Sequence, residues 1–124
     1  MYGFAIWNEF NKIQELTAFD ISVISYLDLM PTWTENDNPL EAYFTFTLIG
    51  IEKDVFLDEY EIESIKLNGS TIRNEDIIYY YDDYGFRFYS SEYKNNNIIN
   101  LIIRNKKTNI EYSKRLKVST ETVY

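Results

Sequence analysis

The most regular pattern of apolar and polar positions lies in the last third of the chain. A dense apolar run at 98–103 is followed by the polar stretch Asn105–Asn109, and then by a second β-rich run. The apolar residues of the second run share one parity: Ile110, Tyr112, Leu116 and Val118. Two such runs joined by a short polar stretch predict a β-hairpin. We expect its first arm to be buried on both faces, its second arm on one face, and the hairpin to form the middle of an antiparallel sheet.

Two earlier segments alternate with the period of two that is typical of half-buried strands. Over 19–30 the residues expected to face inward occupy odd positions, and over 41–51 they occupy even positions. The stretch Pro31–Pro39 separates the two segments, because proline cannot donate a hydrogen bond to a strand ladder. We therefore expect two strands with a loop between them that carries Trp33.

The pair Asn68-Gly69, flanked by apolar residues, predicts a tight hairpin turn because both residues accept a positive φ. The isoleucines before this turn depart from strict alternation, so we expect a β-bulge near Glu63–Ser64. The segment 54–59 is expected to be a connector whose apolar residues tuck beneath the sheet.

Two further short strands are expected over 76–81 and 86–89, around a turn at 82–85. The pattern of a helix, with apolar residues on one side, occurs at 4–17. We expect residues 1–17 to form a short helix or an irregular arm that packs on a single domain made of residues 18–124.

The count of seven or eight short strands, with turn signals every 8–12 residues or so, predicts an all-β protein. At 124 residues, the commonest solution is an antiparallel, immunoglobulin-like β-sandwich. A small β-barrel is the alternative fold. The pattern of cysteines and a core tryptophan that marks antibody-type domains is missing from the chain.

The chain contains no cysteine and no histidine. It therefore lacks a thiolate nucleophile, a zinc–thiolate site and any imidazole to act as general base or metal ligand. Its carboxylates follow no spacing that identifies a catalytic pair or a calcium loop. We expect no enzymatic activity, no catalytic residue, no cofactor and no metal site.

The net charge of −8 is unevenly distributed along the chain. Residues 1–93 carry 18 acidic and 5 basic side chains, whereas 94–124 carry 2 acidic and 7 basic ones. We expect the basic closing strands to lie beside acidic earlier strands as cross-strand partners. Alternatively, folding leaves an acidic face that attracts a basic partner. A nucleic-acid partner is disfavoured in both cases, because the acidic majority repels phosphate.

Tyrosines are concentrated in the stretch 79–89, where alternate rings of a hairpin must face opposite sides. Some of them must therefore stand at the surface, where tyrosine is enriched in binding patches. The candidate binding residues are Tyr80, Tyr84 and Tyr89, with Trp33 as the candidate for stacking on a sugar ring. Alternatively, these tyrosines cover a sheet edge and the tryptophan plugs one end of its own fold.

These patterns favour a non-enzymatic β-sandwich interaction module, an envelope-associated or secreted accessory domain that binds a protein or a glycan through exposed aromatic residues. The alternative is a cytoplasmic acidic antagonist, such as an immunity or inhibitor protein, that binds a basic partner by charge complementarity. No apolar stretch reaches the roughly 18 residues that span a bilayer. The opening residues lack the basic region of a signal peptide. The sequence leaves the compartment unknown: the cell envelope or exterior is slightly favoured if a leader before Met1 has been trimmed, and the cytoplasm otherwise.

Overall fold

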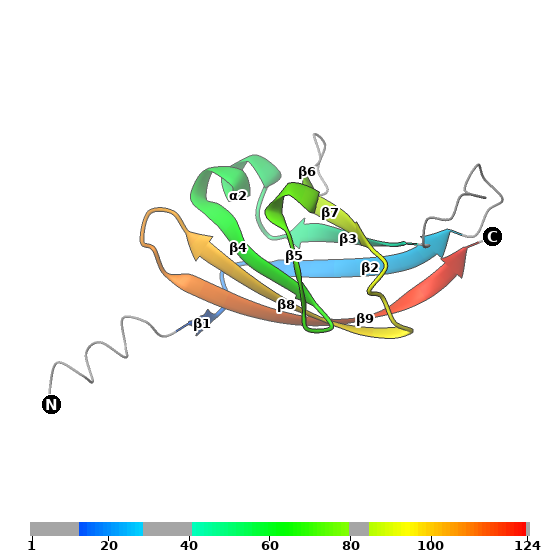
Figure 1. The fold of residues 1–124 in the computed structure, drawn as a ribbon. Helices are drawn as coiled ribbons and strands as arrows, with labels where there is room; N and C mark the ends of the chain where they lie inside the picture. The colour runs from blue at the N-terminus through cyan, green and yellow to red at the C-terminus, as the bar shows by residue number, and fades with distance from the viewer. Residues whose placement is uncertain (1–12, 29–40, 80–84, 124) are drawn as a thin grey trace, which may run out of the picture.

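The computed structural model describes residues 13–28, 41–79 and 85–123, which form a strongly curled sheet with one short α-helix at its end (Figure 1). The elements in chain order are β1 (Gln14–Glu15), β2 (Asp20–Asp28), β3 (Ala42–Ile49), α2 (Lys53–Glu59), β4 (Tyr60–Leu67), β5 (Ser70–Ile72), a 3₁₀ turn (Asn74–Asp76), β6 (Ile78–Tyr79), β7 (Phe86–Ser90), β8 (Asn96–Asn105) and β9 (Glu111–Val123).

The strands form one sheet in the order β5-β4-β8-β9-β2-β3-β7-β6, with β1 beside β9. The β2–β9 and β1–β9 pairs are parallel, and the other pairs are antiparallel. The prediction of a mostly β protein is confirmed. The prediction of a purely antiparallel sheet is wrong, because β9 runs parallel to both of its N-terminal neighbours, and the immunoglobulin-like sandwich is not confirmed. The mixed sheet curls into a half-barrel (Figure 1).

The chain bulges away from the edge of β9 between β1 and β2. Eleven residue steps separate Gln14 from Ser25, whereas eight separate their partners Tyr112 and Thr120. The extra residues let the chain leave β9 and return to it, as a large bulge does. Phe19, within this segment, turns into the core and is 8% exposed.

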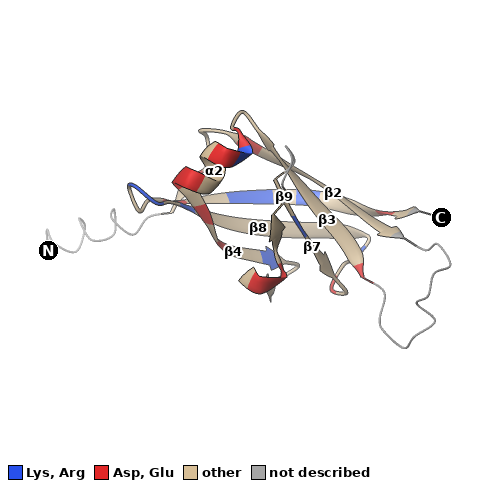
Figure 2. Ribbon diagram, turned by 90° about the horizontal axis from the view of Figure 1, so that it is seen from above, with Lys and Arg blue, Asp and Glu red and all other residues tan. Residues whose placement is uncertain are grey.

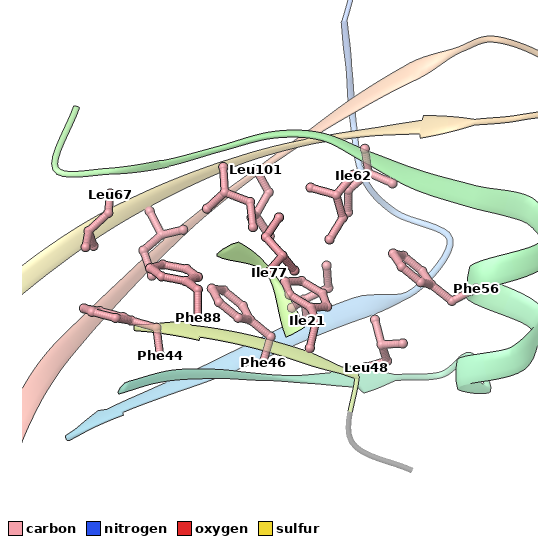
Figure 3. Packing of buried hydrophobic residues seen from close by; sticks show 14 of the residues in the cluster. Ile21, Phe44, Phe46, Leu48, Phe56, Ile62, Leu67, Ile77, Phe88 and Leu101 are labelled. Carbon is pink, nitrogen blue, oxygen red and sulfur yellow. The ribbon is translucent and has the colours of Figure 1, made fainter. Parts of the chain in front are cut away.

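The core lies between the two halves of the curled sheet (Figure 3). One half contributes two stacked pairs of register partners, Phe44 with Phe88 and Phe46 with Phe86, whose ring centroids lie 5.1 and 4.6 Å apart. The other half contributes aliphatic side chains that are fully buried: Ile65, Leu67, Ile99, Leu101 and Ile103. Burial of these residues provides the main drive for folding.

Helix α2 closes one end of this core. The expected connector at 54–59 is therefore wrong in type, because the segment is helical, although Phe56 is tucked in as expected at 1% exposure. Its ring lies 5.7 Å from that of Phe19 and 5.9 Å from that of Tyr60. Leu57, by contrast, is 36% exposed. A helix of two turns is stabilised by this packing more than by its own propensity.

The closing hairpin forms as predicted from β8 and β9 and lies in the middle of the sheet. The prediction that its first arm is buried on both faces is wrong, because Ile98 is 36% exposed and Ile102 is only partly buried. The predicted turn at Asn68-Gly69 is confirmed, with φ values of 51° and 91°. The predicted bulge is also confirmed, between Ile62 and Ser64.

Other predictions fall partly outside the described residues. Of the helix expected at 4–17, the structure describes the last part, and Gln14–Glu15 is a strand rather than a helix because it pairs with β9. Of the strand expected at 76–81, the structure describes residues 76–79, and among these the strand β6 covers Ile78–Tyr79. The strand expected at 86–89 is confirmed as β7.

Candidate protein-binding face

The outer face of β2, β3 and β7, on the side away from the core, carries three tyrosines. Ala42, Phe44 and Phe46 of β3 are buried, so the residues between them point outward. Tyr43 lies between Ala42 and Phe44 and is one of these outward residues. Its register partners are Tyr26 on β2 and Tyr89 on β7. These three tyrosines form one outward row across three neighbouring strands, which we call the aromatic row.

The rings of the aromatic row contact one another along its length. The ring centroids of Tyr26 and Tyr43 lie 4.7 Å apart with the planes tilted by 54°, and those of Tyr43 and Tyr89 lie 4.6 Å apart at 64°. The guanidinium of Arg87 lies 5.3 Å from the centroid of the Tyr89 ring, at cation–π distance. All three tyrosines are half-buried. Because each ring packs on its neighbour, the fold itself holds the row in place.

Two exposed isoleucines lie beside the aromatic row on the same face. Ile24 is 60% exposed and Ile78 is 41% exposed. Ile24 is the register partner of Thr45, which pairs with Arg87, and Arg87 pairs with Ile78. These residues form a second row directly beside the tyrosines. Adjoining apolar and aromatic side chains on one exposed face mark an interaction site more often than single exposed residues do.

The residues predicted from the sequence are only partly placed by the structure. Trp33, Tyr80 and Tyr84 lie outside the described residues, so their predicted binding roles stay predictions. Tyr89 lies in the aromatic row. Sequence reasoning missed Tyr26 and Tyr43, although both occupy the parity opposite the core residues of their strands. That parity was the available signal, but only the strand register shows that they adjoin Tyr89.

Ion pairs join the basic closing strands to the acidic first part of the chain, as the charge distribution predicted. Arg104 on β8 pairs with Glu61 and with Glu63, the latter at 2.7 Å, and Lys114 pairs with Asp20 at 2.8 Å. The hydrogen bond from Arg104 lowers the pKa of the Glu61 carboxyl. The hydrogen bond from Lys114 lowers the pKa of the Asp20 carboxyl in the same way. These charges are thereby partly neutralised within the fold.

Within 13–28, 41–79 and 85–123, no group of three or more metal-ligating side chains lies close enough together to hold a metal ion. In the same ranges, no helix has the length and apolar character needed to cross a membrane. No protein-family model, curated protein or solved structure matches this chain.

Proposed function

We propose that the protein is a non-enzymatic interaction module that binds another protein through the aromatic row and the isoleucines beside it. The observation that carries this proposal is that tyrosines from three strands are gathered on one outward face. The core of this half of the sheet is built from phenylalanine instead. Tyrosine provides a large, stiff contact area with a polar hydroxyl at its tip. Residues of this type are enriched among those that dominate binding energies.

The ring geometry favours a protein over a glycan. Stacking on sugar requires a flat and accessible ring, whereas these rings are half-buried and tilted by 54° and 64° against one another. The neighbouring Ile24, at 60% exposure, adds aliphatic area that suits the apolar centre of a protein interface. Strand-borne side chains held by packing lose little conformational entropy on binding.

The test is a comparison of dissociation constants for the partner recovered by affinity capture with the wild-type domain. Tyr43→Ala removes the central ring of the row, and we expect it to weaken binding roughly thirtyfold, the effect of losing about 2 kcal/mol at a hot spot. Thr47→Ala, on the same strand face but outside the row, is the matched control and should keep the wild-type affinity. Equal affinities for wild type and Tyr43→Ala would show that the proposal is wrong. If the wild type binds a glycan on an array and Tyr43→Ala does not, the ligand of this face is a sugar rather than a protein.

The acidic antagonist remains the second candidate, and the charge on α2 favours it. Asp54 and Asp58 are exposed on this helix, which is one of the most acidic parts of the described chain (Figure 2). Association driven by these charges would weaken steeply with added salt, whereas binding through the aromatic row would change little. A salt titration of the captured complex therefore separates the two functions.

A further inference from the structure

We propose that the outer face of β4, β8 and β9 is a second docking surface, which binds an acidic segment of a partner protein. Three exposed cations define this surface, which we call the basic island: Lys66, Arg115 and Lys117. The proposal is independent of the aromatic row, because the two outer faces belong to opposite halves of the sheet with the core between them (Figure 3).

Strand pairing gathers the basic island from distant parts of the chain. Lys66 on β4 is the register partner of Asn100 on β8, which is the partner of Arg115 on β9. Lys117 follows Arg115 by two residues and therefore faces the same side. Neighbouring strands lie about 4.8 Å apart and alternate residues about 6.8 Å apart. Lys66 and Arg115 thus lie roughly 10 Å apart, and Lys66 and Lys117 roughly 12 Å apart. Figure 2 shows basic residues on β9.

The cations of the basic island lack the acidic partners that the other closing-strand cations have. Within the described part of the chain, none of the three forms an ion pair. The nearest carboxylate by register on this face is Glu15, opposite Ser113, and it too forms no ion pair there. Like charges side by side on a sheet destabilise it. In a chain of net charge −8, an unneutralised cluster of cations suggests a partner outside the fold.

The surface between these cations is hollowed and partly apolar. One depression of about 510 Å³ is lined by Lys66, Asn100, Ile102 and Arg115, among other residues. A second, of about 450 Å³, is lined by Ile98 and Lys117 among others. Ile98 is 36% exposed, so apolar side chains are accessible between the charges. The basic island therefore combines positive charge with a small apolar floor.

An acidic protein segment fits these features better than nucleic acid or a membrane. A net charge of −8 repels every anion over long range, but the repulsion grows with the charge of the ligand, so it opposes a polyphosphate or an anionic lipid surface more than a peptide with a few carboxylates. Phosphate also makes no use of Ile98 or Ile102. An extended peptide with alternating acidic residues places carboxylates about 6.8 Å apart, which matches the spacing of Arg115 and Lys117 along β9.

The test measures binding of a fluorescently labelled peptide of Glu-Leu-Glu-Ser repeats by anisotropy at low ionic strength. The probes for the other classes are a thymidine oligonucleotide and vesicles of phosphatidylcholine and phosphatidylserine. The test variant replaces the basic island (Lys66→Gln, Arg115→Gln, Lys117→Gln). The control variant makes the same change in charge elsewhere on the surface (Arg73→Gln, Lys106→Gln, Lys107→Gln). Circular dichroism confirms that both variants are folded, and amide chemical shifts of the wild type locate the bound peptide.

We expect the wild type to bind the acidic peptide and the test variant to bind it at least about tenfold more weakly. The control variant should change the affinity less than about twofold, and amide shifts should centre on Ile98 and Asn100. Tyr43→Ala should bind the peptide as the wild type does, which keeps this result separate from that of the aromatic row. Absence of peptide binding, equal losses in both Gln variants, or preferential binding of the oligonucleotide or the vesicles would each overturn the proposal. If the test variant is unfolded, the wild type still decides: peptide-induced amide shifts that lie away from β8 and β9 would overturn the proposal.

Discussion

Asn97, at the start of β8, is 1% exposed and joins three separate parts of the chain by hydrogen bonds. Its Oδ1 accepts hydrogen bonds from the backbone N–H of Lys94 at 2.7 Å and from the side-chain amide of Asn68 at 3.0 Å. Its Nδ2 donates to the backbone oxygens of Lys94 and Val118, both at 3.0 Å, and to Oγ1 of Thr120 at 2.9 Å. Asn97 therefore links the β4–β5 turn, the loop before β8, and β9.

The cost of Asn97→Ala follows from the groups that lose a partner. Thr120 keeps a hydrogen bond with Ser25 at 2.9 Å, and the Asn68 amide keeps one with a backbone oxygen. The N–H and the carbonyl of Lys94 and the carbonyl of Val118 lose the contacts described. Each buried polar group left without a partner costs about 1–3 kcal/mol. We expect a loss of about 3 kcal/mol, out of the roughly 6–15 kcal/mol that a domain of this size has.

Urea unfolding followed by circular dichroism measures this loss. The matched control is Asn100→Ala, three residues further along β8 but exposed, and it should change the stability by less than about 0.5 kcal/mol. Asn97→Asp retains the acceptor but loses the amide that donates to the Val118 carbonyl, so it should also be less stable than the wild type. The reasoning is refuted if Asn97→Ala is as stable as Asn100→Ala.

Three further predictions concern the core and its ion pairs. A Cβ at Gly85 would lie 2.8 Å from the backbone oxygen of Phe46, whereas one at Gly69 meets nothing within 4 Å, and both glycines have positive φ. Gly85→Ala should therefore destabilise by about 1–3 kcal/mol more than Gly69→Ala in urea unfolding, and equal losses would show that the close approach is harmless. Phe46→Ala removes a fully buried stacked ring and should cost about 3–5 kcal/mol, measured in the same way; a loss below about 1 kcal/mol would contradict the packing described. Because the pKa of Asp20 lies below its ordinary value of 3.8, its ion pair with Lys114 stabilises the fold above that value and is lost as the pH falls through the folded pKa. The urea midpoint of Asp20→Asn should therefore fall less steeply with decreasing pH over that acid range than the midpoint of the wild type. The same slope in both proteins would argue against the ion pair.

Parity alone was enough to predict which residues of β2 and β3 face the core. It could not predict that β9 pairs in parallel with β2, because alternation is the same in parallel and antiparallel strands. It also could not predict that one strand of 13 residues has β1 and β2 as successive neighbours on one edge. The aromatic row, apart from Tyr89, and the basic island were missed because strand pairing assembles both of them. Only the register places Tyr26 and Tyr43 beside Tyr89. It likewise places Lys66 on the same face as Arg115 and Lys117.

Helix α2 was missed for a different reason. Its seven residues cover about two turns, too few for a period of 3.6 to be told from a turn. The segment is helical because Phe56 packs against Phe19 and Tyr60, and the first of these contacts comes from a distant part of the chain. The buried aromatic residue was visible in the sequence, but its neighbours were not.

Both proposed binding faces depend on the same core, since the alternation that buries one set of side chains orients the other set outward. The stacked phenylalanines hold β3 against β7, and this holds Tyr43 against Tyr89 on the opposite side of the same strands. Likewise, buried Leu101 and Ile99 flank Asn100, which lies between Lys66 and Arg115. A core substitution that loosens the sheet should therefore weaken binding at both faces together. Surface substitutions should weaken one face at a time, because the two faces share no residue and are joined only through a packed interior.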